Sequence, residues 1–148
     1  MIVSFIVFMI FMAFILALWE IQIEGRDGWA AKVPAWRIEK GWVIKLTGGR
    51  PLTGYHVFMT IFLIAIVHLP VFFTKWSWQL ESILFGFYLG MVLVEDFLWF
   101  VLNPYYGIKS FRKGKIWWHK KWWGPLPNFY WILIILAGVL IYFGRAAI

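Results

Sequence analysis

The chain has 148 residues, of which 63% are hydrophobic and only 14% are charged. Soluble globular domains are much richer in charge, so this composition excludes an ordinary water-soluble fold and predicts a bilayer protein. The absence of cysteine excludes disulfides, thiolate metal sites and cysteine nucleophiles. The net charge of +7 favours anionic membrane lipids as partners and not nucleic acid.

Four apolar runs predict four transmembrane helices, because a hydrocarbon core of about 30 Å requires roughly 20 apolar residues per helix. The expected spans cover residues 2–19, 55–74, 80–103 and 128–143. Pro70 lies near the end of the second span, where it is expected only to shorten or kink the helix. The first run lacks the basic segment of a signal peptide and is expected to be retained. We therefore predict an all-α membrane protein, a four-helix bundle that forms one integral membrane domain over residues 1–148.

Basic residues are concentrated in two connections between the spans, at residues 20–54 and 104–127. These connections hold twelve of the fourteen Lys and Arg residues, interleaved with Trp. By the positive-inside rule, both connections are expected on the cytoplasmic side of an inner membrane, with both termini outside. Trp and Lys in alternation also predict interfacial loops that contact membrane lipids.

The third span contains the run LVEDFLWF, residues 93–100, in which Glu95 and Asp96 are adjacent. An ionisable side chain in hydrocarbon costs about 2.5 to 3.5 kcal/mol, so both are expected to face protein or water. Adjacent helical residues point about 100° apart, which places Asp96 on the side of Asn103 and Glu95 on the side of Tyr88. The pair is either structural, fixing the helix register, or functional, which is the usual case inside a membrane.

Polar residues from other segments are expected at a similar depth. Together with the carboxylate pair they form a predicted cluster of Glu20, His56, Glu95, Asp96, Asn103 and His119. Within it, we predict that Glu95, Asp96 and His56 perform acid and base chemistry. The predicted substrate-binding residues are Arg50, Asn103, Lys120, Lys121 and Tyr88, and the basic ones are expected to hold a phosphate or a headgroup.

A divalent metal is a second interpretation of the cluster. Its ligands are predicted to be His56, Asp96, His119 and Glu20, because imidazole and carboxylate groups supply nitrogen and oxygen ligands. The spacings HExxH and ExxH, which are typical of helical metal sites, are absent. His56 and His119 also have structural interpretations, as a hydrogen-bonded helix end and as part of an interfacial anchor.

Ser82, Gly86 and Gly90 recur every four residues in the third span. Small residues at this spacing allow close approach of a second helix. They predict either packing within the chain or a homo-oligomer.

The run VEDFLWFVLNP, residues 94–104, resembles the acidic and aromatic motif of the small membrane lycopene cyclases. The resemblance covers about a dozen residues and departs from the family in having Asp96 as the second acid and no tandem three-span organisation. It implies an isoprenoid substrate, with Glu95 or Asp96 as the proton donor to a polyene.

Three functions follow from these patterns. The preferred hypothesis is an enzyme that acts on a lipid or isoprenoid substrate near the cytoplasmic boundary, and it requires Glu95, Asp96 and His56 to converge on a pocket. The first alternative is a small proton- or cation-conducting transporter or channel, assembled as a homo-oligomer, in which Glu81 and Glu95 face a shared axis beside Tyr88. The second is a non-catalytic lipid-binding scaffold, in which the polar groups are individually hydrogen-bonded and no cavity exists.

Overall fold

The computed structural model describes residues 2–148, which are mostly helical. Its elements in chain order are α1 (Ile2–Glu24), β1 (Arg37–Ile38), α2 (Val43–Leu46), β2 (Leu52–Thr53), α3 (Gly54–Val67), the 3-10 helix η1 (Leu69–Phe72), α4 (Trp78–Leu102), η2 (Ile108–Ser110), β3 (Trp122–Trp123), β4 (Leu126–Pro127), α5 (Asn128–Gly144) and η3 (Arg145–Ala147). The strands form two short antiparallel pairs, β1 with β2 and β3 with β4.

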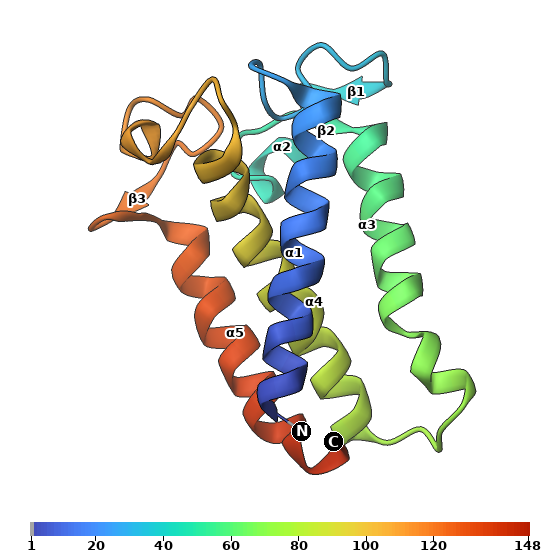
Figure 1. Cartoon of the computed structure of the whole chain (residues 1–148). Helices are drawn as coiled ribbons and strands as arrows, with labels where there is room; N and C mark the ends of the chain where they lie inside the picture. The colour runs from blue at the N-terminus through green and yellow to red at the C-terminus, as the bar shows by residue number, and fades with distance from the viewer. Residues whose placement is uncertain (1) are drawn as a thin grey trace.

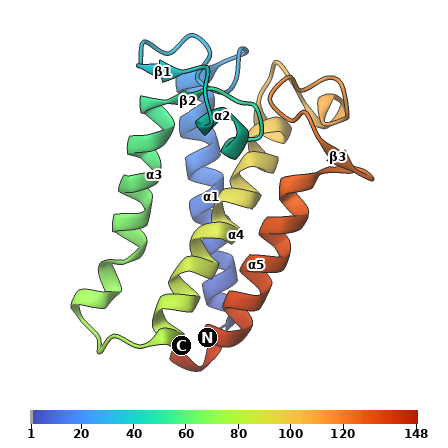
Figure 2. The same ribbon diagram turned by 180° about the vertical axis from the view of Figure 1, so that it is seen from behind.

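Helices α1, α3, α4 and α5 run side by side along one direction (Figure 1). The strands and α2 gather at one end of these helices, which we call the loop end. Figure 2 shows the same arrangement from behind, with the beginning of α1 and the end of α5 together at the opposite end, which we call the terminal end. The two basic connections predicted from the sequence therefore lie at the same end of the molecule.

Helix α4 is the central element and packs against α1, α3 and α5. It begins after Ser77, whose hydroxyl accepts a hydrogen bond from the backbone N–H of Leu80 at 3.1 Å and caps the helix. It ends before Asn103 and Pro104, because the residue that precedes a proline is disfavoured in helical conformation. The outer faces of α1 and α5 instead expose apolar side chains, as lipid-facing helices do.

Three helical segments are long and apolar enough to cross a membrane, which indicates an integral membrane protein. They are α1, α4 and the segment Asn128–Ala147. The predicted four spans are therefore confirmed only in part, because α3 has 14 residues and ends at Val67. The α-helix stops there because the ring of Pro70 would clash with a carbonyl one α-helical turn earlier. Pro70 also disfavours α-helical backbone at Leu69. The chain continues instead as η1, with Pro70 in its first turn.

The predicted small-residue stripe packs within the chain. A Cβ atom at Gly86 would lie 2.7 Å from Cγ1 of Ile141 in α5, and one at Gly90 would lie 2.6 Å from Sδ of Met9 in α1. The Ser82 hydroxyl donates to a carbonyl of its own helix. Both glycines are thus used for close helix packing, and a homo-oligomer through this stripe stays a prediction.

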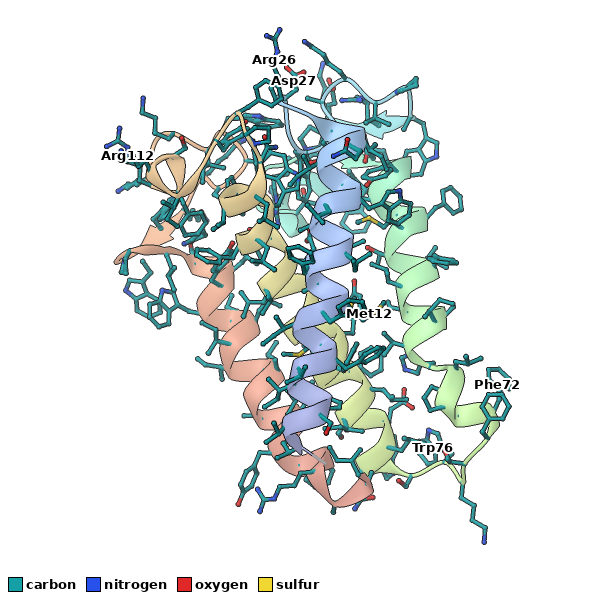
Figure 3. The ribbon with its side chains drawn as sticks, viewed as in Figure 1. Met12, Arg26, Asp27, Phe72, Trp76 and Arg112 are labelled. Atoms are coloured by element: carbon teal, nitrogen blue, oxygen red, sulfur yellow. The ribbon has the colours of Figure 1, made fainter. Side chains whose placement is uncertain are left out.

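The two ends differ in the side chains that they present. Charged residues such as Arg26, Asp27 and Arg112 lie at the loop end, whereas Phe72 and Trp76 lie at the terminal end (Figure 3). The Phe72 side chain is 82% exposed. The loop end therefore carries most of the basic residues, and polar groups near it form the site described next.

Candidate functional site

A cavity of about 410 Å³ lies below the loop end and is the central feature of the site; we call it the central cavity. Its volume lies in the range of small-molecule binding sites. Its polar lining residues are Glu20, Glu24, Thr47, Arg50, His56, Thr60, Tyr88, Glu95 and Asp96. The remaining wall is apolar and aromatic, from residues such as Leu16, Leu63 and Phe100. A mostly apolar wall with a few convergent polar groups is typical of a ligand site.

The carboxyl group of Glu95 is buried beside this cavity and incompletely bonded. The Glu20 carboxyl lines the same cavity. The hydroxyl of Tyr55 donates to Glu20 Oε1 at 3.4 Å. In the described residues 2–148, Oε1 of Glu95 and Nε1 of Trp99 are the buried side-chain atoms without a hydrogen-bond partner. Both residues line the central cavity.

Asp96 is held in a different way from Glu95, through groups that come from α5 and from the second basic connection. Its Oδ2 atom lies 3.1 Å from Nε2 of His119 and also accepts the hydroxyl hydrogen of Tyr130. His119 is buried and stacks on the ring of Phe129 with 5.2 Å between centroids. These contacts orient the Asp96 carboxylate on the cavity wall, since two donors on one oxygen fix its rotamer.

His56 occupies the α3 side of the cavity. Its Nδ1 lies 2.7 Å from the hydroxyl of Thr53, and its Nε2 lies 3.4 Å from Oε1 of Glu24. The ring stacks on Trp29 at 4.2 Å between centroids. A histidine fixed between a hydroxyl and a carboxylate has a defined orientation and can accept or donate a proton.

The segment that supports His56 is strained. Trp29 and Ala30 have φ angles of 49° and 48°, which are uncommon for residues with a Cβ atom. Glu24 Oε1 accepts the backbone N–H of Ala30 at 2.6 Å, and the Trp29 indole donates to the carbonyl of Pro51 at 2.8 Å. Gly28 is required here, because a Cβ atom would lie 2.4 Å from the ring of Trp118. Backbone strain of this kind concentrates at functional sites, where surrounding contacts maintain it.

Arg50 closes the cavity from the loop side. Its guanidinium carbon lies 4.1 Å from the ring centroid of Trp29 and 5.2 Å from that of Phe129. Its Nε donates to the carbonyl of Thr47 at 2.8 Å. Burial lowers the pKa of Arg50 from its ordinary value, and the nearby Asp96 carboxylate opposes this shift. The site thus places a desolvated cation at the mouth of a cavity whose interior carries carboxyl groups.

A second pocket of about 260 Å³ adjoins the central cavity, and we call it the basic pocket. It is lined by Lys45, Thr47, Gly48, Arg50, Trp118, His119, Lys120, Lys121, Pro127, Asn128, Phe129 and Ile132. Four of these residues also line the central cavity, namely Thr47, Arg50, Trp118 and Phe129. The two spaces therefore share a wall.

The structure brings most of the residues singled out in the sequence to these two spaces. Glu20, Arg50, His56, Tyr88, Glu95 and Asp96 line the central cavity, and His119, Lys120 and Lys121 line the basic pocket. Asn103 lies at neither. Its Nδ2 donates to the carbonyl of Gly25 and its Oδ1 accepts the N–H of Tyr105, so it joins two loops behind α4.

The proposed metal ligands do not form one group. His119 contacts Asp96, whereas His56 contacts Glu24 on the other side of the cavity. Across residues 2–148, no set of three or more His, Asp and Glu side chains is arranged to hold a metal ion. The predicted metal ligands thus have different partners. Asp96 pairs with His119, His56 pairs with Glu24, and Glu20 accepts a hydrogen bond from Tyr55.

Sequence reasoning left three important residues out of the site. Glu24 follows Glu20 by one helical turn, a spacing that signals a shared face. Tyr130 lies in the first turn of α5, where an aromatic hydroxyl at the membrane boundary is a weak signal. Trp29 carried no local signal for its role, because its stacking on His56 depends on how the first basic connection folds back.

Comparison of the chain with protein-family models, with curated proteins and with solved structures finds no match.

Proposed function

We propose that the chain is a four-span membrane enzyme that performs acid–base chemistry on a lipid or isoprenoid substrate at the cytoplasmic boundary. The observation that carries this proposal is the pair of unpartnered buried atoms, Glu95 Oε1 and Trp99 Nε1, in side chains on the wall of one cavity. Buried polar groups are nearly always paired. An acceptor and a donor left over at the same cavity are suited to a ligand's hydroxyl or carbonyl group.

The membrane placement treats α3 and η1 together as the fourth span. Residues 54–72 are about 30 Å long at the usual rises of the two helix types, which equals the thickness of a hydrocarbon core. Twelve of the fourteen basic residues then lie at the loop end, which favours a cytoplasmic position for this end and an outside position for both termini. The central cavity consequently lies just inside the cytoplasmic leaflet.

The acid–base roles follow from the contacts of each group. Glu95 is the proposed proton donor or acceptor, because its Oε1 has no hydrogen-bond partner among residues 2–148 and its side chain lines the cavity. Asp96, with both His119 and Tyr130 on Oδ2, is a fixed negative charge that stabilises a developing positive charge in the substrate. His56 is the partner base on the opposite wall, oriented by Thr53 and Glu24.

The two alternatives have less support. The channel hypothesis needs Glu81 and Glu95 on one polar route, but Glu81 bonds His68 and Trp76 at the terminal end and does not line the central cavity. The scaffold hypothesis needs polar groups that are individually satisfied, which the free atoms of Glu95 and Trp99 do not favour.

Proton transfer to or from carbon supplies a direct test. Purified protein in lipid nanodiscs is incubated in D₂O with an added mixture of undecaprenol, undecaprenyl diphosphate, farnesol and farnesyl diphosphate. After back-exchange in H₂O, mass spectrometry measures products and carbon-bound deuterium in every lipid. We expect one lipid class to change with the wild type and not with Glu95→Gln. No difference between the two proteins in any lipid would overturn the proposal.

A further inference from the structure

The basic pocket collects cations from two connections that are far apart in the sequence. Lys45 and Arg50 come from the first basic connection, and Lys120 and Lys121 come from the second. No Asp or Glu is among the described residues that line the pocket. Bringing like charges together costs free energy unless an anion compensates them, so the pocket is built for a negatively charged group.

Arg50 is the most specific element of this arrangement. Trp29 and Phe129 cover its guanidinium group, and Thr47 accepts the hydrogen of Nε. Within residues 2–148, no carboxylate lies at ion-pair distance from Arg50, and its two terminal nitrogens make no hydrogen bond. A planar guanidinium held in this way offers a paired set of donors that matches phosphate oxygens.

Lys120 is positioned by a second contact between the two connections. Its Nζ donates to the carbonyl of Gly49 at 2.6 Å, which places the ammonium group beside Arg50. Gly49 has a φ of 89° and would bring a Cβ atom within 3.0 Å of Nζ, so the glycine permits this approach. Lysines on an interfacial loop also attract headgroups without specificity. The half-buried Arg50, covered by two aromatic rings, therefore distinguishes a built site from a merely basic surface.

The shared wall links this anion site to the acid–base groups. Arg50 lines both spaces, with the lysines and His119 on one side and with Glu95 and Asp96 on the other. Because Arg50 lines both spaces, a ligand whose phosphate binds Arg50 has its adjoining carbon chain beside the central cavity. The apolar wall there, including Leu16 and Leu63, suits a hydrocarbon chain.

We propose that the ligand of this site is a phosphate-bearing lipid, in which a phosphate or diphosphate binds Arg50, Lys45, Lys120 and Lys121 while the chain enters the central cavity. This inference rests on the proposed function and names its substrate class. The group that reacts is then the part of the chain nearest the phosphate, because this part lies beside Glu95 and Asp96. No bond to phosphorus is formed or broken in the proposed acid–base step.

Binding of defined probes tests the inference. Quenching of tryptophan fluorescence, confirmed by native mass spectrometry, is measured in nanodiscs of neutral lipid with farnesyl diphosphate, farnesol and inorganic diphosphate. We expect farnesyl diphosphate to bind at least about tenfold more tightly than farnesol, because charge-assisted hydrogen bonds contribute about 1.5 to 3 kcal/mol. Inorganic diphosphate is expected to compete only weakly, since it lacks the chain. Equal affinities for farnesol and farnesyl diphosphate would overturn the inference, and preference for inorganic diphosphate would indicate a site for free phosphate.

Variants locate the binding. Arg50→Gln and the double variant Lys120→Gln with Lys121→Gln are each expected to weaken farnesyl diphosphate binding about tenfold or more. The control double variant, Lys109→Gln with Lys113→Gln, removes the same charge from the same connection outside the basic pocket and should bind like the wild type. The lysine pair is exposed, so its replacement tests the site even if Arg50→Gln fails to fold. An equal loss in the control and the site variant would mean that only net charge matters, and would overturn the inference.

Failure of this inference is separable from failure of the proposed function. Deuterium incorporation into farnesol or undecaprenol alone would retain the enzyme and remove the phosphate site. Tight, Arg50-dependent binding of farnesyl diphosphate without any Glu95-dependent change in a lipid would retain the phosphate site and remove the enzyme.

Discussion

Helix α4 carries Glu81 near one end and Glu95 near the other, and these two carboxylates differ in their hydrogen bonding. Glu81, at the terminal end, has a partner on each oxygen, with His68 Nε2 at 3.2 Å from Oε1 and Trp76 Nε1 at 3.0 Å from Oε2. Glu95 lies fourteen residues further on, about 21 Å along the helix, and keeps one oxygen without a partner beside a cavity.

The difference shows that a carboxylate in an apolar run is not by itself a functional signal. His68 is bound in turn to the carbonyl of Ile64 through Nδ1 at 2.7 Å, so the cluster at the terminal end is complete and ties η1 to α4. At the loop end the polar groups are partly satisfied and surround space. The proposed role of Glu95 rests on this difference, because buried polar groups are nearly always paired, as those of Glu81 are.

We expect the largest effect when Glu95 and Glu81 are replaced by glutamine in two separate variants. Glu95→Gln should lower the rate of deuterium incorporation at least about 100-fold, because the amide cannot exchange a proton with the substrate. Glu81→Gln is the matched control on the same helix and should retain the rate within about twofold, since general acid–base losses arise only at the reacting group. Equal losses in both variants would remove the distinction between the two ends.

Close contact between α4 and α5 fixes the position of α4, and therefore of both Glu81 and Glu95, relative to the other helices. Gly86→Leu should lower the free energy of unfolding by about 1 to 3 kcal/mol, because the new side chain meets Ile141. Gly138→Leu is the control, since a Cβ atom at Gly138 meets nothing within 4 Å. Thermal unfolding in detergent measures both. A homo-oligomer that packs through Gly86 would show a change in mass by light scattering as well.

Two histidine–carboxylate pairs, His119 with Asp96 and His68 with Glu81, provide a sharper contrast. His119→Gln should lower the rate of deuterium incorporation about tenfold, because Asp96 loses a charge-assisted partner at 3.1 Å. His68→Gln should leave the rate unchanged and lower the thermal unfolding midpoint, because its partner Glu81 has no part in the proposed chemistry. A fall in rate with His68→Gln would link the terminal end to the site.

We expect the smallest effect when the hydrogen bond from Trp76 to Glu81 at the terminal end is removed. Trp76→Phe removes the hydrogen bond to Glu81 and should lower the free energy of unfolding by about 0.5 to 1.5 kcal/mol. Trp78→Phe removes a similar exposed indole for which no hydrogen bond is present among residues 2–148, and it should have no such effect. Equal changes would mean that burial of the ring, and not its bond to Glu81, stabilises this end.

Much of the site was accessible from the sequence, for particular physical reasons. Glu95 and Asp96 are expensive in hydrocarbon, and this cost alone predicted that they face a polar space. The helical angle predicted Glu95 on the side of Tyr88 and Asp96 on the side of Asn103, whereas in the structure Glu95, Asp96 and Tyr88 all line the central cavity. Asn103, predicted on the same grounds, instead joins loops.

What the sequence by itself determined is the membrane environment of the chain. Hydrophobic runs of sufficient length specify helices that cross a bilayer, and the distribution of Lys and Arg groups the two connections on one side. The exception is residues 55–74, where hydropathy continues through Pro70 but the α-helix does not.

Only the tertiary structure decided which polar groups meet. His119 reaches Asp96 across 23 residues of chain, Tyr130 reaches it from α5, and Arg50 lies between Trp29 and Phe129. These contacts depend on the order and rotation of the helices and on how two loops fold over them, which no local pattern encodes. The same packing brought Gly86 against α5 and left Oε1 of Glu95 without a hydrogen-bond partner, whereas both oxygens of Glu81 are bonded.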